Sequence, residues 1–442
     1  MMKRVLGWVI FALVAVFIGF VVWLFFFKGD AAPTTYAPPD RGESFFPIDL
    51  QNGIGREGVL NPDGTFGNQN PGSNIIPRVR QLSQVPVAGA VAFERPTGSS
   101  ETYISDQGVE ESRAFTITTF RYIERATGHL YEARENSLTQ TRLSNTTIPK
   151  MHYAKFSPNG EYVLLQYLAE DEETVETLSA KVTSKSTTSP ETFQLVADGY
   201  ALEGVYLSQN IVSADIGANG LSYIIKNNTG GSSLILSDLR DQTKRIIHES
   251  PFVEWIVQRP NVNISTLTTK ADSRAPGFAY LVNTSGGAPT KLLGDTNGLT
   301  TLVNPDNTWM IYSVSRGNEL DTYAYSIKKN ETKRLGIKTL PEKCVFSQQD
   351  EDVLFCGATD QPERVAYPET WYQGLSTFND NLWKVNLETE SYEALLIDKE
   401  EVNQSFDITK LTVSPRDEFV VFVNKKDLTL WSVDITKARG VQ

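Results

Sequence analysis

A short hairpin pattern that returns along the chain constrains the fold more than any other feature of the sequence. Residues 151–167 read MHYAKFSPNGEYVLLQY, in which two apolar runs flank a Ser-Pro-Asn-Gly turn. Proline presets the first torsion angle of such a turn and glycine accepts a positive φ, so this pattern predicts a β-hairpin. The pattern returns, in fuller or weaker form, at residues 216–225, 258–267, 303–313, 346–356 and 413–423.

The spacing of these hairpins indicates the architecture. The residues before the predicted turns are numbers 156, 216, 258, 303, 346 and 413, so the intervals are 60, 42, 45, 43 and 67 residues. Three of the five intervals match the 40–45 residues of a four-stranded propeller blade, and the longer two leave room for insertions. After most hairpins come two further stretches of alternating apolar residues, as in DTYAYSIKKNETKRLG (321–336), which is typical of half-buried strands.

The sequence therefore predicts an all-β fold, a seven-bladed β-propeller over residues 80–442, with a six- or eight-bladed ring as the alternative. The seven units are expected at about 85–150, 151–203, 204–250, 251–296, 297–338, 339–400 and 401–442. The last unit has no clear fourth strand after Ile435. We expect PRVRQLSQV (77–85) to supply that strand, because pairing the two ends of the chain leaves no open edge.

The hairpins, their spacing and third strands such as NLWKVNL (381–387) and LTLWSVDI (428–435) resemble those of WD-type and TolB-type β-propellers over about 360 residues. Three further strings are PVAGAVAF (86–93), RYIERATGHLYE (121–132) and YPETWYQG (367–374). They resemble uncharacterised membrane-anchored propeller proteins of candidate-phylum (Patescibacteria-type) bacteria. This second resemblance implies a bacterial cell-envelope location and brings no catalytic residues with it.

A membrane anchor is predicted near the N-terminus. Residues 5–27 read VLGWVIFALVAVFIGFVVWLFFF, without a charge or a proline. A helix of this length spans about 35 Å, enough for a hydrocarbon core of roughly 30 Å. Lys3 and Arg4 precede it and favour a cytoplasmic N-terminus. We therefore expect a cytoplasmic tail over 1–4, a signal anchor over 5–27 in the bacterial cytoplasmic membrane, and an extracytoplasmic remainder; a cleaved signal peptide is the alternative.

Residues 28–79 are rich in Pro, Gly, Asn and Asp and show no lasting apolar periodicity. This composition predicts an extended linker between the anchor and the propeller. One strip, SFFPIDL, interrupts it and contains Phe45 and Phe46. The strip either docks back on the propeller, which we favour, or serves as a partner-binding motif.

Charge and composition exclude several classes of function. The 41 Lys and Arg residues are outnumbered by 53 Asp and Glu, for a formal net charge of −12, so no nucleic-acid partner is expected. The three histidines, His129, His152 and His248, lie in separate units, which predicts no metal site. The chain contains no G-x-S-x-G elbow, phosphate loop or dinucleotide fingerprint, so we expect no cofactor and nominate no catalytic residues.

The two cysteines flank one predicted hairpin turn. Cys344 and Cys356 are centred on Asp350, and antiparallel pairing would place them opposite each other, within reach of a disulfide. Outside the cytoplasm such a bond would persist. Two buried free thiols are the alternative.

A long insertion in the sixth unit is the strongest candidate for a specific surface. Residues 357–379 contain Tyr367, Trp371 and Tyr372 on a segment too long for a tight turn. Aromatic rings on loops with Pro and Gly are typical of recognition sites, so these three are predicted partner-binding residues. The alternative is that the segment caps the propeller and the rings anchor it.

These observations favour a membrane-anchored, extracytoplasmic binding or scaffold module for an envelope protein, peptide or glycan. A binding role is favoured because no nucleophile–base pair can be nominated. The alternative is a carbohydrate-active hydrolase or lyase that uses carboxylates around the propeller channel.

Overall fold

The structure is a computed structural model that describes residues 59–60, 66–67, 75–104, 110–185, 199–397 and 401–437. The predicted signal anchor, most of the linker, Phe45 and Phe46 lie outside these residues. Within the described ranges, no helix combines the length and the apolar character needed to cross a bilayer. A small two-stranded sheet of β1 (Val59–Leu60) and β2 (Phe66–Gly67) precedes the main domain in sequence.

Seven four-stranded antiparallel sheets form the main domain, and each is one blade. Blades 1 and 2 consist of β4 (Val87–Ile104), β5 (Glu110–Glu124), β6 (Leu130–Arg134) and β7 (Gln140–Arg142), then β8 (Met151–Phe156), β9 (Tyr162–Leu168), β10 (Val175–Ser184) and β11 (Tyr200–Tyr206). Blades 3 and 4 consist of β12 (Ile211–Ile216), β13 (Leu221–Lys226), β14 (Ser232–Ser237) and β15 (Lys244–Ser250), then β16 (Trp255–Asn261), β17 (Ile264–Thr269), β18 (Pro276–Asn283) and β19 (Thr290–Asn297).

Blades 5 and 6 follow in the same order. They consist of β20 (Thr301–Val303), β21 (Trp309–Arg316), β22 (Glu319–Ser326) and β23 (Glu331–Arg334), then β24 (Cys344–Phe346), β25 (Val353–Ala358), β26 (Asn381–Asn386) and β27 (Ser391–Leu396). Blade 7 contains β28 (Ile408–Val413), β29 (Phe419–Asn424), β30 (Leu430–Asp434) and, from the other end of the chain, β3 (Val79–Ser83). Two short helices, η2 (Pro341–Lys343) and α2 (Glu369–Tyr372), belong to connections.

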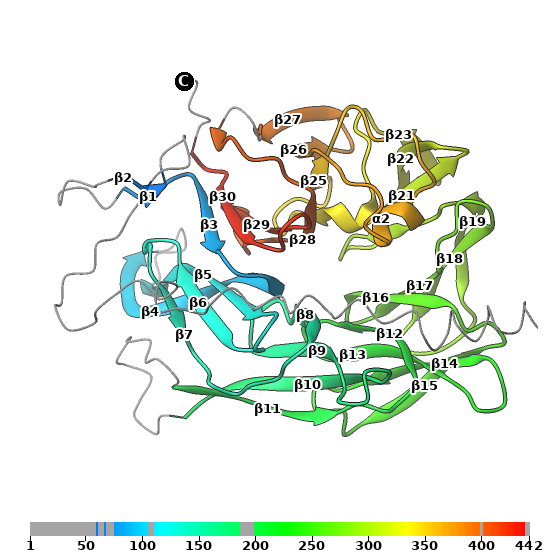
Figure 1. The fold of residues 1–442 in the computed structure, drawn as a ribbon, viewed down its shortest axis with the longest axis horizontal. Coiled ribbons are helices and arrows are strands. Elements are labelled where there is room, and N and C mark those ends of the chain that lie inside the picture. The colour runs from blue at the N-terminus through cyan, green and yellow to red at the C-terminus, as the bar shows by residue number, and fades with distance from the viewer. Residues whose placement is uncertain are drawn as a thin grey trace, which may run out of the picture. The chain divides into compact units, whose positions relative to one another are not determined.

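Consecutive blades meet through their first strands, as β4 meets β8, β12 meets β16, and β28 meets both β24 and β4. The sheets therefore follow one another around a ring, each running from an inner first strand to an outer fourth strand (Figure 1). This arrangement confirms the predicted seven-bladed β-propeller. The apolar core lies mainly between blades; Phe355 and Leu382 of blade 6, for example, share one buried cluster with Phe422 and Trp431 of blade 7.

The ring is closed in blade 7 by the strand predicted from residues 77–85. β3 pairs antiparallel with β30, with Val79 opposite Val433 and Ser83 opposite Leu430, and the two strands lie side by side in Figure 1. Arg78, just before β3, adds an ion pair to Glu401 at 2.6 Å. The first and last strands of the ring thus form one sheet.

The hairpin turns are held by the serine of the sequence pattern. Ser157 Oγ accepts a hydrogen bond from the Tyr162 N–H at 3.0 Å, and Ser414 Oγ accepts one from the Phe419 N–H at the same distance. The turn predicted directly after residue 258 was wrong. β16 continues through Pro260 to Asn261, and a register irregularity between residues 258 and 261 accommodates a proline that has no N–H to donate.

The two cysteines are paired, which is the first of the two alternatives that their spacing leaves open. Cys344 on β24 lies directly opposite Cys356 on β25. Their sulfur atoms are joined as a disulfide, and both side chains are buried.

Replacing both cysteines with alanine (Cys344→Ala/Cys356→Ala) is expected to lower the free energy of unfolding by about 3 kcal/mol. The bond closes a loop with a sequence separation of 12, and chain entropy predicts this magnitude for such a loop. Urea denaturation of the oxidised protein, the reduced protein and the double variant would measure the effect. Two alkylatable thiols in the non-reduced protein would contradict the disulfide.

Candidate functional site

One face of the propeller carries both the turns between the second and third strands and the connections between blades. In an antiparallel blade the turn between the second and third strands lies at the same end as the connection to the next blade. We call this end of the ring the connection face. It carries η2 and α2, which precede β24 and β26 respectively.

The insertion predicted from the sequence lies on the connection face, between β25 and β26. We call its residues 359–379 the capping segment. Tyr367, Trp371 and Phe378 of this segment pack with Leu320 of blade 5 and Leu340, just before blade 6, in one buried cluster. The aromatic side chains of the capping segment therefore form its buried core.

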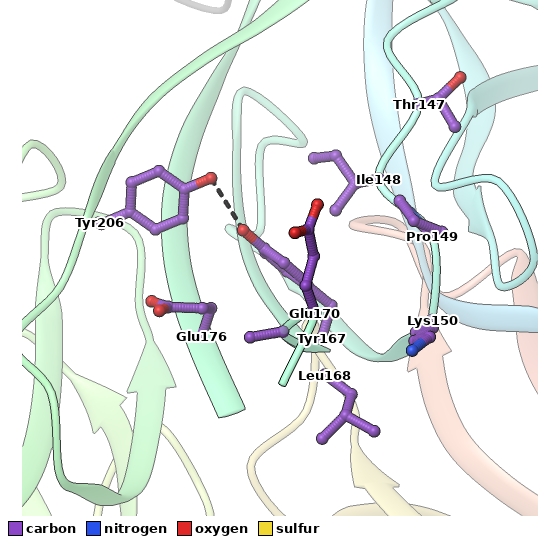
Figure 2. Close-up of a pocket in the computed structure, with 10 residues that line it drawn as sticks. Thr147, Ile148, Pro149, Lys150, Tyr167, Leu168, Glu170, Glu176 and Tyr206 are labelled. Carbon is purple, nitrogen blue, oxygen red and sulfur yellow. Dashed lines mark hydrogen bonds between the residues drawn. The ribbon is translucent and has the colours of Figure 1, made fainter. Parts of the chain in front are cut away.

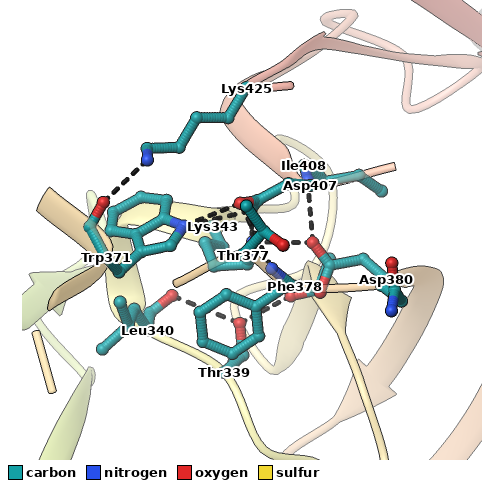
Figure 3. A network of polar contacts seen from close by, with 12 residues as sticks. Thr339, Leu340, Lys343, Trp371, Thr377, Phe378, Asp380, Asp407, Ile408 and Lys425 are labelled. Atoms are coloured by element: carbon teal, nitrogen blue, oxygen red, sulfur yellow. Dashed lines mark hydrogen bonds and ion pairs between the residues drawn. The ribbon is translucent and has the colours of Figure 1, made fainter. Parts of the chain in front are cut away.

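A buried ion network fastens the capping segment to blades 6 and 7 (Figure 3). Lys343 Nζ lies 2.6 Å from Asp380 Oδ2 and 2.5 Å from Asp407 Oδ1, and all three side chains are fully buried. Trp371 Nε1 donates to Asp407 Oδ2 at 3.0 Å, and the Phe378 N–H donates to the same oxygen at 3.2 Å. Burial raises the pKa of Asp380 to about 6, although the Lys343 ammonium opposes the shift.

Further hydrogen bonds attach the capping segment to blades 4 and 7 and to the connection before blade 6. Lys425 Nζ donates to the Trp371 carbonyl oxygen at 2.7 Å, as Figure 3 shows. Glu369 Oε1 accepts the Ser273 N–H of blade 4 at 2.5 Å. The Tyr372 hydroxyl donates to Glu342 Oε1, and burial raises the pKa of Glu342. The segment is thus tied to blades on either side of blade 5 and is held in one position.

The structure separates the three predicted partner-binding aromatics. Tyr367 and Trp371 are buried, which favours the anchoring alternative for these two rings. Tyr372 is half exposed, and near it in sequence Leu375 is 74% exposed. Partner binding through Tyr372 stays a prediction, and Leu375 is an exposed apolar residue that the sequence reasoning did not single out.

The ion network was also missed, because nothing in the sequence links its members. Lys343 and Asp407 are 64 residues apart and belong to different predicted units. Charged residues near predicted strands are normally solvated. No spacing pattern could have indicated that these would be buried together.

A groove opens between blades 4 and 5, also at the connection face. It has a volume of about 420 Å³. The end of β19, the β21–β22 turn and the rings of Tyr312 and Tyr323 line it. These two rings stack with their centroids 5.3 Å apart. Glu319, the first residue of β22, forms an ion pair with Arg364 of the capping segment at 3.6 Å.

A second cavity of about 450 Å³ lies where blades 1 and 2 meet (Figure 2). Its walls are the connection around Ile148 and Pro149 and the ends of β9 and β11. The hydroxyls of Tyr167 and Tyr206 are hydrogen-bonded at 2.8 Å. In Figure 2 the Glu170 side chain stands between Ile148 and the Tyr167 ring. This cavity too lies at the connection face, since its walls are the blade 1–blade 2 connection and the strand ends next to the turn between the second and third strands of blade 2.

The buried carboxylates Asp215, Asp380 and Asp407 are already engaged in ion pairs. Asp215 on the inner strand β12 is buried, forms an ion pair with Lys155, and accepts the Arg259 N–H at 2.8 Å. Asp380 and Asp407 are bound to Lys343 and have no contact with solvent. In the part of the chain that the structure describes, no group of three or more His, Cys, Asp or Glu could hold a metal ion. These carboxylates therefore do not favour the hydrolase or lyase alternative.

Comparisons with known proteins find only distant structural similarity. No protein-family model matches the chain, and a search of curated proteins finds no significant match. An oligogalacturonate lyase from Vibrio parahaemolyticus is 12% identical, with 78% of this chain and 98% of that chain covered and a TM-score of 0.43. The β-propeller domain of the Trilobed protease from Pyrococcus furiosus is 11% identical, with 73% and 95% covered and a TM-score of 0.44.

TolB from Acinetobacter baumannii is 14% identical, with 78% of this chain and 79% of that chain covered and a TM-score of 0.39. At these identities the chain is similar to the three proteins in fold alone. The resemblance to candidate-phylum envelope proteins stays a prediction.

Proposed function

We propose that the chain is a membrane-anchored, extracytoplasmic β-propeller that binds or scaffolds a protein, peptide or glycan partner in the bacterial cell envelope. The segment 5–27 would hold it in the cytoplasmic membrane with the N-terminus in the cytoplasm, and the linker would carry the ring away from the bilayer. The connection face would meet the partner.

One observation carries this proposal: the capping segment is rigidly held yet leaves apolar side chains exposed. Its inner side has the buried aromatic cluster and the ion network. Its outer side presents Tyr372, 50% exposed, and Leu375, 74% exposed. A preorganised loop loses little conformational entropy on binding, so such a surface suits recognition.

A charge placed at this surface tests the proposal. We expect Leu375→Asp to reduce partners captured from native membranes at least tenfold, measured by quantitative mass spectrometry, because a carboxylate at an interface centre must be desolvated. The melting transition should stay within about 2 °C of wild type, since an exposed leucine contributes little to stability.

The matched control is Ile246→Asp, the same kind of change at an exposed apolar residue, 55% exposed, in the outer strand of blade 3. It should leave the captured partners unchanged. Equal partner profiles for wild type, Leu375→Asp and Ile246→Asp would exclude the capping segment as the binding surface.

A further inference from the structure

The groove between blades 4 and 5 has an unusual set of polar side chains at its walls. Asp295, Thr296 and Asn297 come from the end of β19, and Ser315 and Arg316 from the end of β21. Residues that carry a carboxylate, an amide, two hydroxyls and a guanidinium thus line one space of about 420 Å³. The volume lies at the small end of the range for ligand pockets, about 300–1,000 Å³.

Several of these polar groups keep hydrogen-bonding capacity for a ligand. Asn297 Nδ2 donates to the Ser273 carbonyl oxygen at 3.2 Å, which orients the amide and leaves its oxygen available. Within the described residues, the Asp295 side chain forms neither an ion pair nor a hydrogen bond. A ligand that donates to Asp295 and Asn297 would replace hydrogen bonds to water and would not have to break hydrogen bonds within the protein.

The Arg316 side chain can also donate hydrogen bonds to a ligand. Its guanidinium lies 3.8 Å from Asp321 Oδ2, beyond hydrogen-bond distance, and its side chain is 66% exposed. Arg334 binds the other oxygen of Asp321 at 2.5 Å, so the charge of that carboxylate is already compensated. The Arg316 guanidinium carbon lies 5.9 Å from the centroid of the Tyr323 ring, so Arg316 packs over one wall of the groove. Its N–H donors have no short hydrogen bond to Asp321, and removing Arg316 would not leave Asp321 unpaired.

The groove is shaped by its backbone and by the capping segment. Gly298 has φ +64°, and a Cβ there would meet Ser315 Cβ at 2.5 Å and the Tyr367 carbonyl oxygen at 2.8 Å. Only glycine allows this approach of blade 4, blade 5 and the capping segment. The rings of Tyr312 and Tyr323 stack with an inclination of only 16°, and because Tyr312 is buried, the aromatic surface of the groove is mainly that of Tyr323. The site is thus preorganised.

We infer that this groove binds a saccharide unit of an envelope glycan. Sugar hydroxyls donate and accept at once, which suits adjacent carboxylate, amide and guanidinium groups, and sugar rings pack on aromatic side chains. An apolar ligand would leave Asp295 and Asn297 without hydrogen bonds. A small inorganic anion would be repelled by the carboxylate of Asp295, which has no cationic partner among the described residues. This inference rests on the proposed binding function and names the ligand class.

Full-length protein in lipid nanodiscs, applied to an array of neutral, N-acetylated and uronate-containing oligosaccharides, tests the inference. At least one class should bind, and Arg316→Ala and Asp295→Asn should each weaken that binding about tenfold or more, as expected for the loss of one or two polar contacts. The control is Arg274→Ala, which removes an arginine that is 86% exposed and not among the groove residues. It should bind as the wild type does.

Failure to bind any oligosaccharide would overturn the inference, as would binding that Arg316→Ala and Asp295→Asn leave unchanged. If protein partners are nevertheless lost in Leu375→Asp, the proposed binding function stands and only the ligand class is wrong. If both the array and the Leu375→Asp comparison are negative, the proposed function fails as well.

Discussion

Deletion of residues 75–84 is expected to abolish the cooperative unfolding transition of the propeller. The deletion removes β3, the fourth strand of blade 7, and with it the pairing of the first and last strands of the ring. Leu82, buried in the cluster between blades 7 and 1, is lost too. Since each blade is stabilised mainly by its neighbours, opening the ring exposes both ends of the stack and the free edge of β30.

Differential scanning calorimetry of the deletion variant would show a broad or absent transition in place of one sharp peak. A permuted variant provides the control: residues 75–84 are moved to follow Gln442 in the deleted chain. Because β3 pairs antiparallel with β30, the moved strand can fold back as a simple hairpin, and we expect the transition to return. A sharp, unshifted peak in the simple deletion would contradict closure by β3.

Replacement of Lys343 with methionine is expected to lower the free energy of unfolding by about 3–5 kcal/mol. The substitution keeps much of the side-chain volume but leaves Asp380 and Asp407 buried, close together and without their counter-ion. Removing one partner of a buried ion pair carries a cost of this size, because the remaining charge is neither solvated nor compensated. Trp371 and Phe378, whose ring centroids lie 5.2 and 4.3 Å from Lys343 Nζ, lose a cation–π contact as well.

Urea denaturation followed by tryptophan fluorescence would measure this loss as a shift in the midpoint at constant slope. The matched control is Lys425→Met, which removes a less buried lysine from the same region, its hydrogen bond to the Trp371 carbonyl oxygen and its cation–π contact with the Trp371 ring at 4.8 Å. We expect the free energy of unfolding to fall by about 1 kcal/mol. The triple variant Lys343→Met/Asp380→Asn/Asp407→Asn removes all three charges and should recover part of the stability. A Lys343→Met protein as stable as Lys425→Met would show that the network does not hold the capping segment.

Most of the blade architecture could be predicted from the sequence because its causes are local. The alternation of apolar residues and the Ser-Pro turn act within about a dozen residues, and blade repetition makes each weak signal count several times. The one misplaced turn, after residue 258, shows the limit of this reasoning. A proline usually indicates a turn. Here Pro260 lies within β16, because an irregularity in the pairing of β16 with β17 accommodates it.

The candidate site was predictable only in part. The length and aromatic content of the insertion pointed to the right segment, since a loop too long for a tight turn must find a place on the surface. Which rings face inward depends on Leu320, Leu340 and the Lys343 network, and these groups are distant in sequence. The groove between blades 4 and 5 was missed for the same reason, because Asp295 and Arg316 carry no pattern that links them.

By itself, the sequence determined that the chain forms four-stranded blades, that seven units follow one another, and that residues near 80 return to complete the last of them. Those properties follow from turn chemistry and from apolar periodicity, which neighbouring residues decide. Only the tertiary structure decided that Trp371 is buried while Tyr372 and Leu375 are exposed, and that Lys343, Asp380 and Asp407 share one site. Burial and ion pairing depend on which side chains meet when the ring closes, and that meeting is a property of the whole fold rather than of any one segment.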